Sequence, residues 1–286
     1  SPAAHAGMLA GDQLLSVGGK EVEHLSTFEV EEMLVGAPDS SVTLRFRRMG
    51  DAEPREVDLK REPVALHTVR GVKRLPDGSW DYWIDHVAGV GYIRVSNFRE
   101  NTGAEFDAAL SQLRKSNLQA LILDLRFNPG GFLHQAVAMA DRFLSDGLIV
   151  STVNRRSAID EFRAEAGESD VDAYLVVLMN GGSASSSEIV AGALQARGRA
   201  KVVGERSFGK GSVQHLIQLM GQKAAIKLTV AYYRLPDGRI IHRTENGRGI
   251  AESGDWGIKP DIEVILTPDE SHAIQEARRV LDLPPQ

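Results

Sequence analysis

Cysteine is absent from all 286 residues of this chain. Its absence excludes disulfide bonds, thiolate nucleophiles and zinc sites built from cysteine. The compartment stays open, because a protein without cysteine suits oxidising and reducing surroundings alike. Uninterrupted apolar stretches are short too, and none approaches the ~20 residues of a membrane-spanning helix. The opening residues, SPAAHAGMLAGDQ, lack the basic and apolar regions of a signal peptide, so we expect any targeting segment to lie outside this sequence.

Positive charge is also scarce. The chain has 33 lysine and arginine residues against 39 aspartate and glutamate residues, for a formal net charge of -6. The densest basic run, RFRRMG at residues 45–50, stands at the end of a predicted strand and is interpreted as a solvated edge. Without a strongly basic stripe, the sequence argues against nucleic-acid binding.

Known metal and nucleotide motifs are missing as well. The eight histidines include no H-E-x-x-H pair or comparable close spacing. The segment SFGKGS at residues 207–212 contains G-K-G-S but not the G-x-x-x-x-G-K-[ST] spacing of a phosphate loop. The sequence therefore predicts no metal site and no cofactor.

What is present is an ordinary globular composition, with 42% hydrophobic and 25% charged residues in a length that suits roughly two domains. The first part predicts a strand at 13–17, a helix at 26–37 capped by Ser26 or Thr27, and a strand at 40–48. A further strand at 55–64 ends near Pro63, where we place a domain boundary.

From about Leu66 onward, predicted strands alternate with predicted helices, which indicates an α/β fold with substantial parallel sheet. A β-hairpin with an Asp-Gly turn is predicted at 225–241, a long loop at 242–257 and a polar helix at 269–282. The alternating segments are, in chain order, strands at 91–98, 118–127, 147–154, 173–180 and 200–206, and helices at 103–117, 130–145 and 185–199.

Three motifs fall at strand-to-helix junctions, where α/β folds usually place their sites. The first, DLRFNPGG at 124–131, has two glycines whose backbone amides can approach an anion near a helix N-terminus. The second, NGGSASSSEIVAG at 180–192, holds four serines in five positions. A capping box between Ser185 and Glu188 accounts for one of them. A nucleophilic serine on a strand-to-helix turn is the alternative.

The third motif, GERSFGKGSVQHL at 204–216, places Lys210 between two glycines. Such a lysine is most often a solvated charge, but a buried lysine can act as a general base. An ordinary lysine has a pKa near ~10.4, so burial would have to lower it by roughly 3 units. Neither His134 nor His215, the histidines nearest these motifs, stands in a recognisable hydrolase motif.

Taken together, the three motifs resemble those of the carboxyl-terminal processing, or tail-specific, serine proteases. SPAAHAGMLAGD at the start resembles the S-P-A-x-x-A-G run of a PDZ domain, and GIKPDIEV near the end matches too. The resemblance implies a Ser–Lys dyad with a spacing of 25 residues, which assigns Ser185 as nucleophile and Lys210, held neutral by burial, as base. It also implies that Gln214 holds the lysine in place.

The same resemblance implies an oxyanion hole made by the backbone N–H of Ser186 and one from Gly130 or Gly131. Ser186 stands where the family most often has alanine, a departure that leaves the backbone amide in place. Ser183 and Ser187 are expected to be structural.

The fold implied by the resemblance is a Clp protease/crotonase-like spiral of ββα units, preceded by a small α+β PDZ domain. We expect PDZ at 1–63, without its N-terminal strand and carboxylate-binding loop, the protease core at 64–268, and a helix and tail at 269–286. We expect the native protein to begin upstream with these missing parts.

The implied function is cleavage near the carboxyl termini of exported or unfolded proteins, in the periplasm, cell envelope or thylakoid lumen. Substrates would be proteins or peptides with free C-termini, and a homo-oligomer is left open. One alternative is a non-catalytic peptide- or ligand-binding protein on the same fold, as in the retinoid-binding proteins of the eye. Another is a crotonase-type acyl-CoA enzyme, which would not need the PDZ segment or the Ser–Lys spacing.

Overall fold

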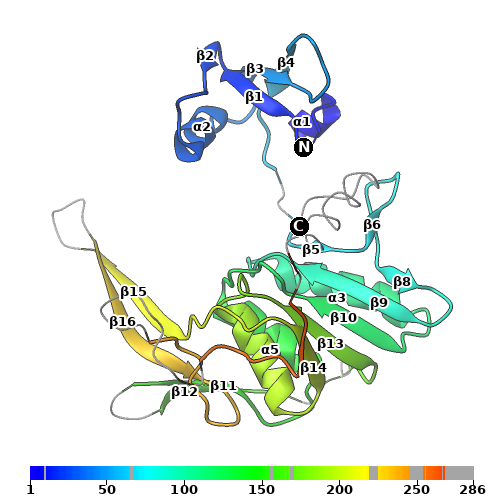
Figure 1. Ribbon diagram of the computed structural model, residues 1–286, viewed down its shortest axis with the longest axis vertical. Helices are drawn as coiled ribbons and strands as arrows, with labels where there is room; N and C mark the ends of the chain where they lie inside the picture. Colours follow the sequence, from blue (N-terminus) through cyan, green and yellow to red (C-terminus); the bar gives the residue numbers. More distant parts are fainter. Residues whose placement is uncertain are drawn as a thin grey trace. The chain divides into compact units, whose positions relative to one another are not determined.

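The computed structural model describes residues 1–9, 11–64, 67–154, 158–165, 167, 171–218, 225–244, 254, 256–265 and 267 (Figure 1). It divides into two compact units, and the second begins at His67. Each unit is described by itself. The predicted helix at 269–282 and most of the predicted loop at 242–257 lie outside the described residues.

The first unit is an antiparallel sheet with two helices, α1 (Pro2–His5) and α2 (Thr27–Leu34). Ser26 caps α2 in a capping box with Glu29, as the sequence predicts. The alternation in the strand at 41–47 also holds, because its inward side chains are buried. The strands follow the order β2 (Lys20–Glu21), β1 (Gln13–Val17), β3 (Ser41–Arg47) and β4 (Arg55–Lys60).

The second unit is built on a mixed sheet whose central strands are parallel. These strands are near-continuous apolar runs because helices and loops cover them, as the sequence predicts. Two antiparallel strands, β5 and β8, pair with β9. The strands of this sheet are, in order, β17 (Ile262–Glu263), β14 (Ala200–Gly204), β13 (Tyr174–Met179), β10 (Ala120–Asp124), β9 (Val90–Val95) and β5 (Val69–Arg70), with β8 (Trp83–Asp85) on β9.

Three helices accompany this sheet: α3 (Thr102–Arg114), α4 (Leu133–Asp141) and α5 (Ser186–Ala196). α4 packs against both α3 and α5, and α3 and α5 also pack against strands of this sheet. The core is strongly apolar, and α5 is buried from Ser186 through Leu194. A helix buried on all sides is fixed firmly, so its N-terminus is a rigid platform for the turn that precedes it. Among the described helices, none is long and apolar enough to cross a membrane.

A second sheet is antiparallel, and Figure 1 shows its last two strands as a long ribbon that extends away from the helices. A small hairpin of β6 (Lys73–Arg74) and β7 (Trp80–Asp81) stands apart from both sheets. The strands of the second sheet are, in order, β12 (Ala158–Arg163), β11 (Leu148–Val153), β16 (Ala225–Arg234) and β15 (Ser212–Gln218).

The predicted hairpin at 225–241 is wrong in its pairing. β16 pairs with β15, which precedes it, and with β11. Across the Asp-Gly turn only an isolated bridge joins Arg234 to Ile240. The Asp-Gly signal identified a turn, but the strand ahead of it, β16, pairs along its two edges with β15 and β11.

Candidate active site

The three motifs meet at one edge of the large sheet. β10, β13 and β14 are parallel neighbours, so their carboxyl ends lie side by side. Each is followed by one motif: residues 125–132 after β10, 180–185 after β13 and 205–211 after β14. We call these segments the glycine loop, the serine turn and the lysine loop. Their position is where parallel sheets commonly hold functional groups.

Three of the four serines are buried and serve to tie the serine turn and α5 to the glycine loop. Each of the three hydroxyls donates to a backbone carbonyl, which satisfies a polar group that would otherwise be buried without a partner. The bonds run from Ser183 Oγ to Leu125 O (2.8 Å), from Ser186 Oγ to Gly131 O (2.9 Å) and from Ser187 Oγ to Asn128 O (2.9 Å).

Ser185 differs from the other three serines. It is partly exposed, and its hydroxyl makes none of the carbonyl bonds that hold its neighbours. Its backbone has φ 57° and ψ -116°, a conformation that strains a residue with a side chain by about 1–3 kcal/mol. A strained serine between a strand and a helix N-terminus is the arrangement of a nucleophile elbow, which exposes the hydroxyl oxygen.

Ser185 and Glu188 form the predicted capping box, but its two halves are unequal. The Glu188 carboxylate accepts the N–H of Ser185 at 2.7 Å. The N–H of Glu188 is bonded at 2.8 Å to the Ser185 carbonyl, whereas the Ser185 hydroxyl makes no cap hydrogen bond of ordinary length. Capping therefore engages the backbone of Ser185 at ordinary hydrogen-bond lengths, and among the described residues no carbonyl accepts a bond from its hydroxyl.

Glu188 is fully buried and joins the serine turn to the lysine loop. Its Oε2 accepts the backbone N–H groups of Ser185 (2.7 Å) and Lys210 (2.9 Å). Its Oε1 accepts Ser207 Oγ (2.5 Å) and the N–H of Gly209 (2.7 Å). Burial raises the pKa of the Glu188 carboxyl, although these four bonds favour its charged form. The shared oxygen keeps the backbone nitrogens of Ser185 and Lys210 within two hydrogen-bond lengths of each other.

The expected burial of Lys210 is wrong for this arrangement, because its side chain is exposed. The inner side of the lysine loop is already filled. A Cβ at Gly209 would lie 2.7 Å from the Cβ of Arg243, and one at Gly211 would lie 2.5 Å from the backbone nitrogen of His242. Among the described residues, none forms a hydrogen bond or an ion pair with Lys210 Nζ.

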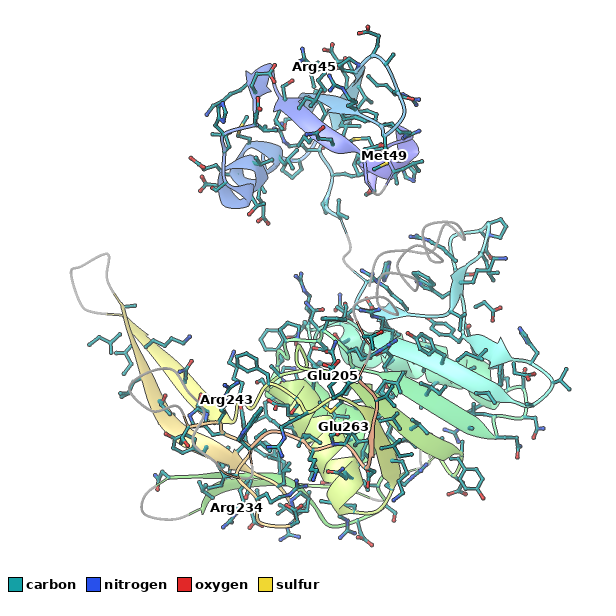
Figure 2. All side chains as sticks on the ribbon, viewed as in Figure 1. Arg45, Met49, Glu205, Arg234, Arg243 and Glu263 are labelled. Carbon is teal, nitrogen blue, oxygen red and sulfur yellow. The ribbon has the colours of Figure 1, made fainter. Side chains whose placement is uncertain are left out.

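An arginine–tryptophan stack lies against the same loop. The guanidinium groups of Arg206 and Arg243 each lie 4.8 Å from the ring centroid of Trp256. Arg206 also donates to the Trp256 carbonyl at 3.2 Å. Figure 2 labels Arg243 between the large sheet and the base of the β15–β16 ribbon. Cation–π contacts of this kind hold the backbone of the lysine loop in place.

Gln214 lies in β15 and is exposed, and its amide donates to Thr229 Oγ1 at 3.4 Å across the ribbon. The structure therefore does not bring the Gln214 and Lys210 side chains together. Both belong to the same stretch of chain, with Gln214 four residues further on.

The three predicted oxyanion donors differ in availability. The N–H of Gly130 donates to Asn128 Oδ1 at 2.9 Å and is thus engaged. No described residue accepts a hydrogen bond from the N–H of Gly131 or Ser186. Gly130 instead allows a close approach, since a Cβ there would lie 2.7 Å from Ser185 Cβ.

Sequence reasoning missed the polar residues beneath the glycine loop. Asp124 is fully buried and accepts two bonds from the Arg126 guanidinium, at 2.9 and 2.7 Å, and one from Tyr92 Oη at 2.7 Å. Burial opposes ionisation of Asp124, but the bonds from Arg126 and Tyr92 outweigh it and hold its pKa below the usual range. The signal was an aspartate closing an apolar strand with an arginine two residues later.

Asn128 was missed as well, and it fixes the turn of the glycine loop. Its amide donates to Val95 O at 2.9 Å and its side-chain oxygen accepts the N–H of Gly130. Its carbonyl accepts the N–H of Ala184 at 2.9 Å and the Ser187 hydroxyl. Nothing in the sequence distinguishes this asparagine from an ordinary turn residue.

A strained serine at a helix N-terminus, with free backbone amides beside it, defines a serine hydrolase type of site on an α/β sheet. Family models agree with this class: that of peptidase family S41 matches residues 89–264, and that of a PDZ domain matches residues 1–48. The chain belongs to peptidase family S41.

Relatives support the same assignment. The carboxy-terminal-processing protease of Bartonella bacilliformis is 38% identical over 269 residues, which are 92% of this chain and 56% of that protein. The carboxyl-terminal-processing protease of Synechocystis sp. is 39% identical over 268 residues, 94% of this chain and 57% of that protein. This chain thus spans a little over half the length of these relatives.

A solved structure, that of a photosystem II D1 C-terminal processing protease, is 31% identical and matches 94% of this chain and 68% of that one, with a TM-score of 0.57. The predicted fold, an α/β core of this family preceded by a PDZ domain, is confirmed.

Glu188→Gln tests the link between the serine turn and the lysine loop. Glutamine replaces one carboxylate oxygen with an NH2 group, which cannot accept hydrogen bonds. Each Glu188 oxygen accepts two bonds, so two of the four bonds would be lost. We expect kcat for a peptide substrate to fall about 100-fold through misplacement of the reacting groups, with the fold retained. Glu205→Gln is the matched control, because the carboxylate of Glu205, labelled in Figure 2, accepts from just one group in the described part of the chain, the N–H of Gly181 at 3.3 Å. Equal effects of the two variants would contradict this role.

Arg126→Met tests the buried pair beneath the glycine loop. Removing the guanidinium leaves Asp124 charged and buried, so we expect a loss of about 3 kcal/mol in unfolding free energy at pH 7. Because the pKa of Asp124 is lower in the folded state, the carboxylate contributes fully to the free energy of unfolding above its unfolded pKa near ~3.9. That contribution is lost as pH falls through the folded pKa. The deficit of the variant should therefore shrink below pH ~4. Tryptophan fluorescence during urea unfolding measures it, since all three tryptophans lie in the second unit. A deficit constant from pH 7 to pH 3 would refute the assignment.

Proposed function

We propose that this chain carries the catalytic site of a serine endopeptidase in which Ser185 is the nucleophile and Lys210 the general base. The observation that carries the proposal is the contrast among the four serines. Three hydroxyls are buried and bonded to carbonyls, whereas Ser185 is partly exposed on a strained backbone. Strain of this kind persists only where the surrounding structure enforces it, and it gathers at functional sites.

The reaction follows from these positions. Ser185 Oγ attacks the carbonyl carbon of the scissile bond and gives its proton to Lys210 Nζ. The N–H groups of Gly131 and Ser186 stabilise the negative oxygen of the tetrahedral intermediate. When the C–N bond breaks, the Lys210 ammonium protonates the leaving amine. Water then attacks the acyl-enzyme, with Lys210 again taking the proton, and Ser185 is regenerated.

Lys210 must turn its side chain towards Ser185 for this chemistry. Its backbone is already held beside Ser185 by the shared Glu188 oxygen, so the movement is confined to the side chain and to Gln214. We propose that Gln214 exchanges its long bond to Thr229 (3.4 Å) for one to the turned lysine. A bond of that length is weak and is readily given up.

The relatives named above are carboxyl-terminal processing proteases, and we propose the same substrate class here: proteins cut near their carboxyl termini. The PDZ domain would present those termini by strand addition. Bacterial and chloroplast relatives support a location in the periplasm, cell envelope or thylakoid lumen.

A serine scan tests the nucleophile against its neighbours. Ser185→Ala and Lys210→Ala are each expected to reduce casein cleavage by about 1000-fold or more, with unfolding free energy unchanged. Ser187→Ala is the matched control: it removes a buried bond, so it should cost about 1 kcal/mol of stability and keep the activity. Cleavage products would be mapped by mass spectrometry. Activity that survives in Ser185→Ala would sink the proposal.

The exposed lysine is the one observation that favours the alternative, a non-catalytic binding protein. The pH profile separates the two. A lysine base must lose its proton before it acts, so kcat/KM is expected to rise from pH 6 towards pH 10. A flat profile would argue against the base, and no cleavage by the wild type would favour the binding protein.

A further inference from the structure

Phe127, in the glycine loop, combines two unfavourable features. Its φ is 59°, in the left-handed region that bulky residues avoid. Its side chain is 56% exposed, so burial of the ring does not offset that strain. The backbone is held by a 2.9 Å bond from its N–H to Asn180 Oδ1. Strain without burial indicates a functional reason for the side chain's position.

The Phe127 ring lies on the serine turn. A Cβ at Gly182 would come within 3.0 Å of Phe127 Cδ1, so the turn has a glycine where the aromatic ring approaches. Gly182 also donates to the same Asn180 oxygen at 3.1 Å. The ring thus packs against Gly182, three residues ahead of Ser185, while the Phe127 backbone is held by Asn180.

Phe208 approaches the same turn from the lysine loop. Its N–H donates to the carbonyl of Ser183 at 2.9 Å, and its side chain is 52% exposed. It stands two residues before Lys210. The Phe127 ring and the Phe208 backbone therefore contact the serine turn from the two loops that flank it.

Exposure of phenylalanine is concentrated here. Of the phenylalanine side chains that the structure describes, the exposed ones are Phe127, Phe208 and Phe132 at the end of the glycine loop. The others are buried or partly buried in the core. Large exposed apolar side chains on loops that flank the same turn are typical of a binding surface, and these loops border the proposed nucleophile.

We infer that Phe127 and Phe208 form an apolar subsite that receives an apolar substrate side chain within about three residues of the scissile bond. The inference rests on the proposed function and deepens it by naming a substrate preference. An extended peptide whose carbonyl lies at Ser185 runs past the serine turn, and its side chains point to alternate faces. One of them meets the two rings and is desolvated there, which stabilises binding by apolar burial.

The test is the residue preference around the cut. A proteome-derived peptide library is digested by the wild type, and the residues at three positions on each side of every cut are counted by mass spectrometry. We expect leucine, methionine, valine or phenylalanine to be enriched at one position. A matched peptide pair, leucine against serine at that position, should differ about 10-fold in kcat/KM.

Two variants and one control separate recognition from folding. Phe127→Gly suits the left-handed backbone, so its melting temperature should stay equal or rise while the preference falls towards none. Phe208→Ala should reduce the preference likewise, and Phe208→Leu should keep it. Tyr174→Ala is the control, because this 84% exposed aromatic lies at the opposite end of β13.

The outcomes distinguish this inference from the proposed function. Cleavage that depends on Ser185 but shows no apolar preference, or a preference unchanged in Phe127→Gly and Phe208→Ala, overturns the subsite alone. A lower melting temperature in Phe127→Gly with the preference intact would make Phe127 a structural anchor. The rings bind a second copy of the chain instead if two results coincide: the apparent molar mass in solution falls on dilution for the wild type but not for the two variants, and the residue preference around the cut is unchanged in the variants. No Ser185-dependent cleavage at all overturns both proposals.

Discussion

The Glu188 carboxylate is the interaction on which the site depends. The serine turn and the lysine loop are more than twenty residues apart in sequence, yet both donate hydrogen bonds to this one carboxylate. A fully buried carboxylate is unfavourable unless donors surround it, and here four donors converge on it. Removing any of those donors leaves the charge less compensated, so the two loops are coupled through the stability of one group. Through this carboxylate, the serine turn is held next to the lysine loop, which is distant from it in sequence.

The surrounding hydrogen bonds explain the strained backbone of Ser185. Its positive φ is maintained because the turn cannot relax. Ser183, Ser186 and Ser187 bond it to the glycine loop, Glu188 holds the Ser185 amide, and buried α5 fixes the exit. The glycine loop is in turn supported by Asn128 and by the Asp124–Arg126 pair. Four serines in five positions are thus divided between two tasks, with three securing the backbone that presents the fourth.

Much of this could be predicted from the sequence because the signals are local. Apolar runs such as 118–127 and 173–180 identified the buried parallel strands, and the Ser26 and Ser185 caps lie beside the helices they begin. The choice of Ser185 among four serines came from the resemblance to the protease family, whose 25-residue spacing was counted back from Lys210. What failed depends on distant partners. Arg243 and Trp256, which occupy the inner side of the lysine loop, follow it by more than thirty residues. β16 pairs with β15 and β11 and not with the residues that follow its Asp-Gly turn.

The exposure of Lys210 follows from the same division between backbone and side chain. The backbone nitrogens of Ser185 and Lys210 are fixed by their bonds to Glu188, but a lysine side chain loses up to about 2 kcal/mol of conformational entropy when it is ordered. The exposed Lys210 side chain stays in contact with water, and taking a charged group out of water is costly unless it gains a partner. A substrate that displaces water from Ser185 and the Phe127–Phe208 rings removes that advantage. In the proposed mechanism, the Lys210 side chain would then turn towards Ser185 as substrate binds, so that the pair forms when there is a bond to cut.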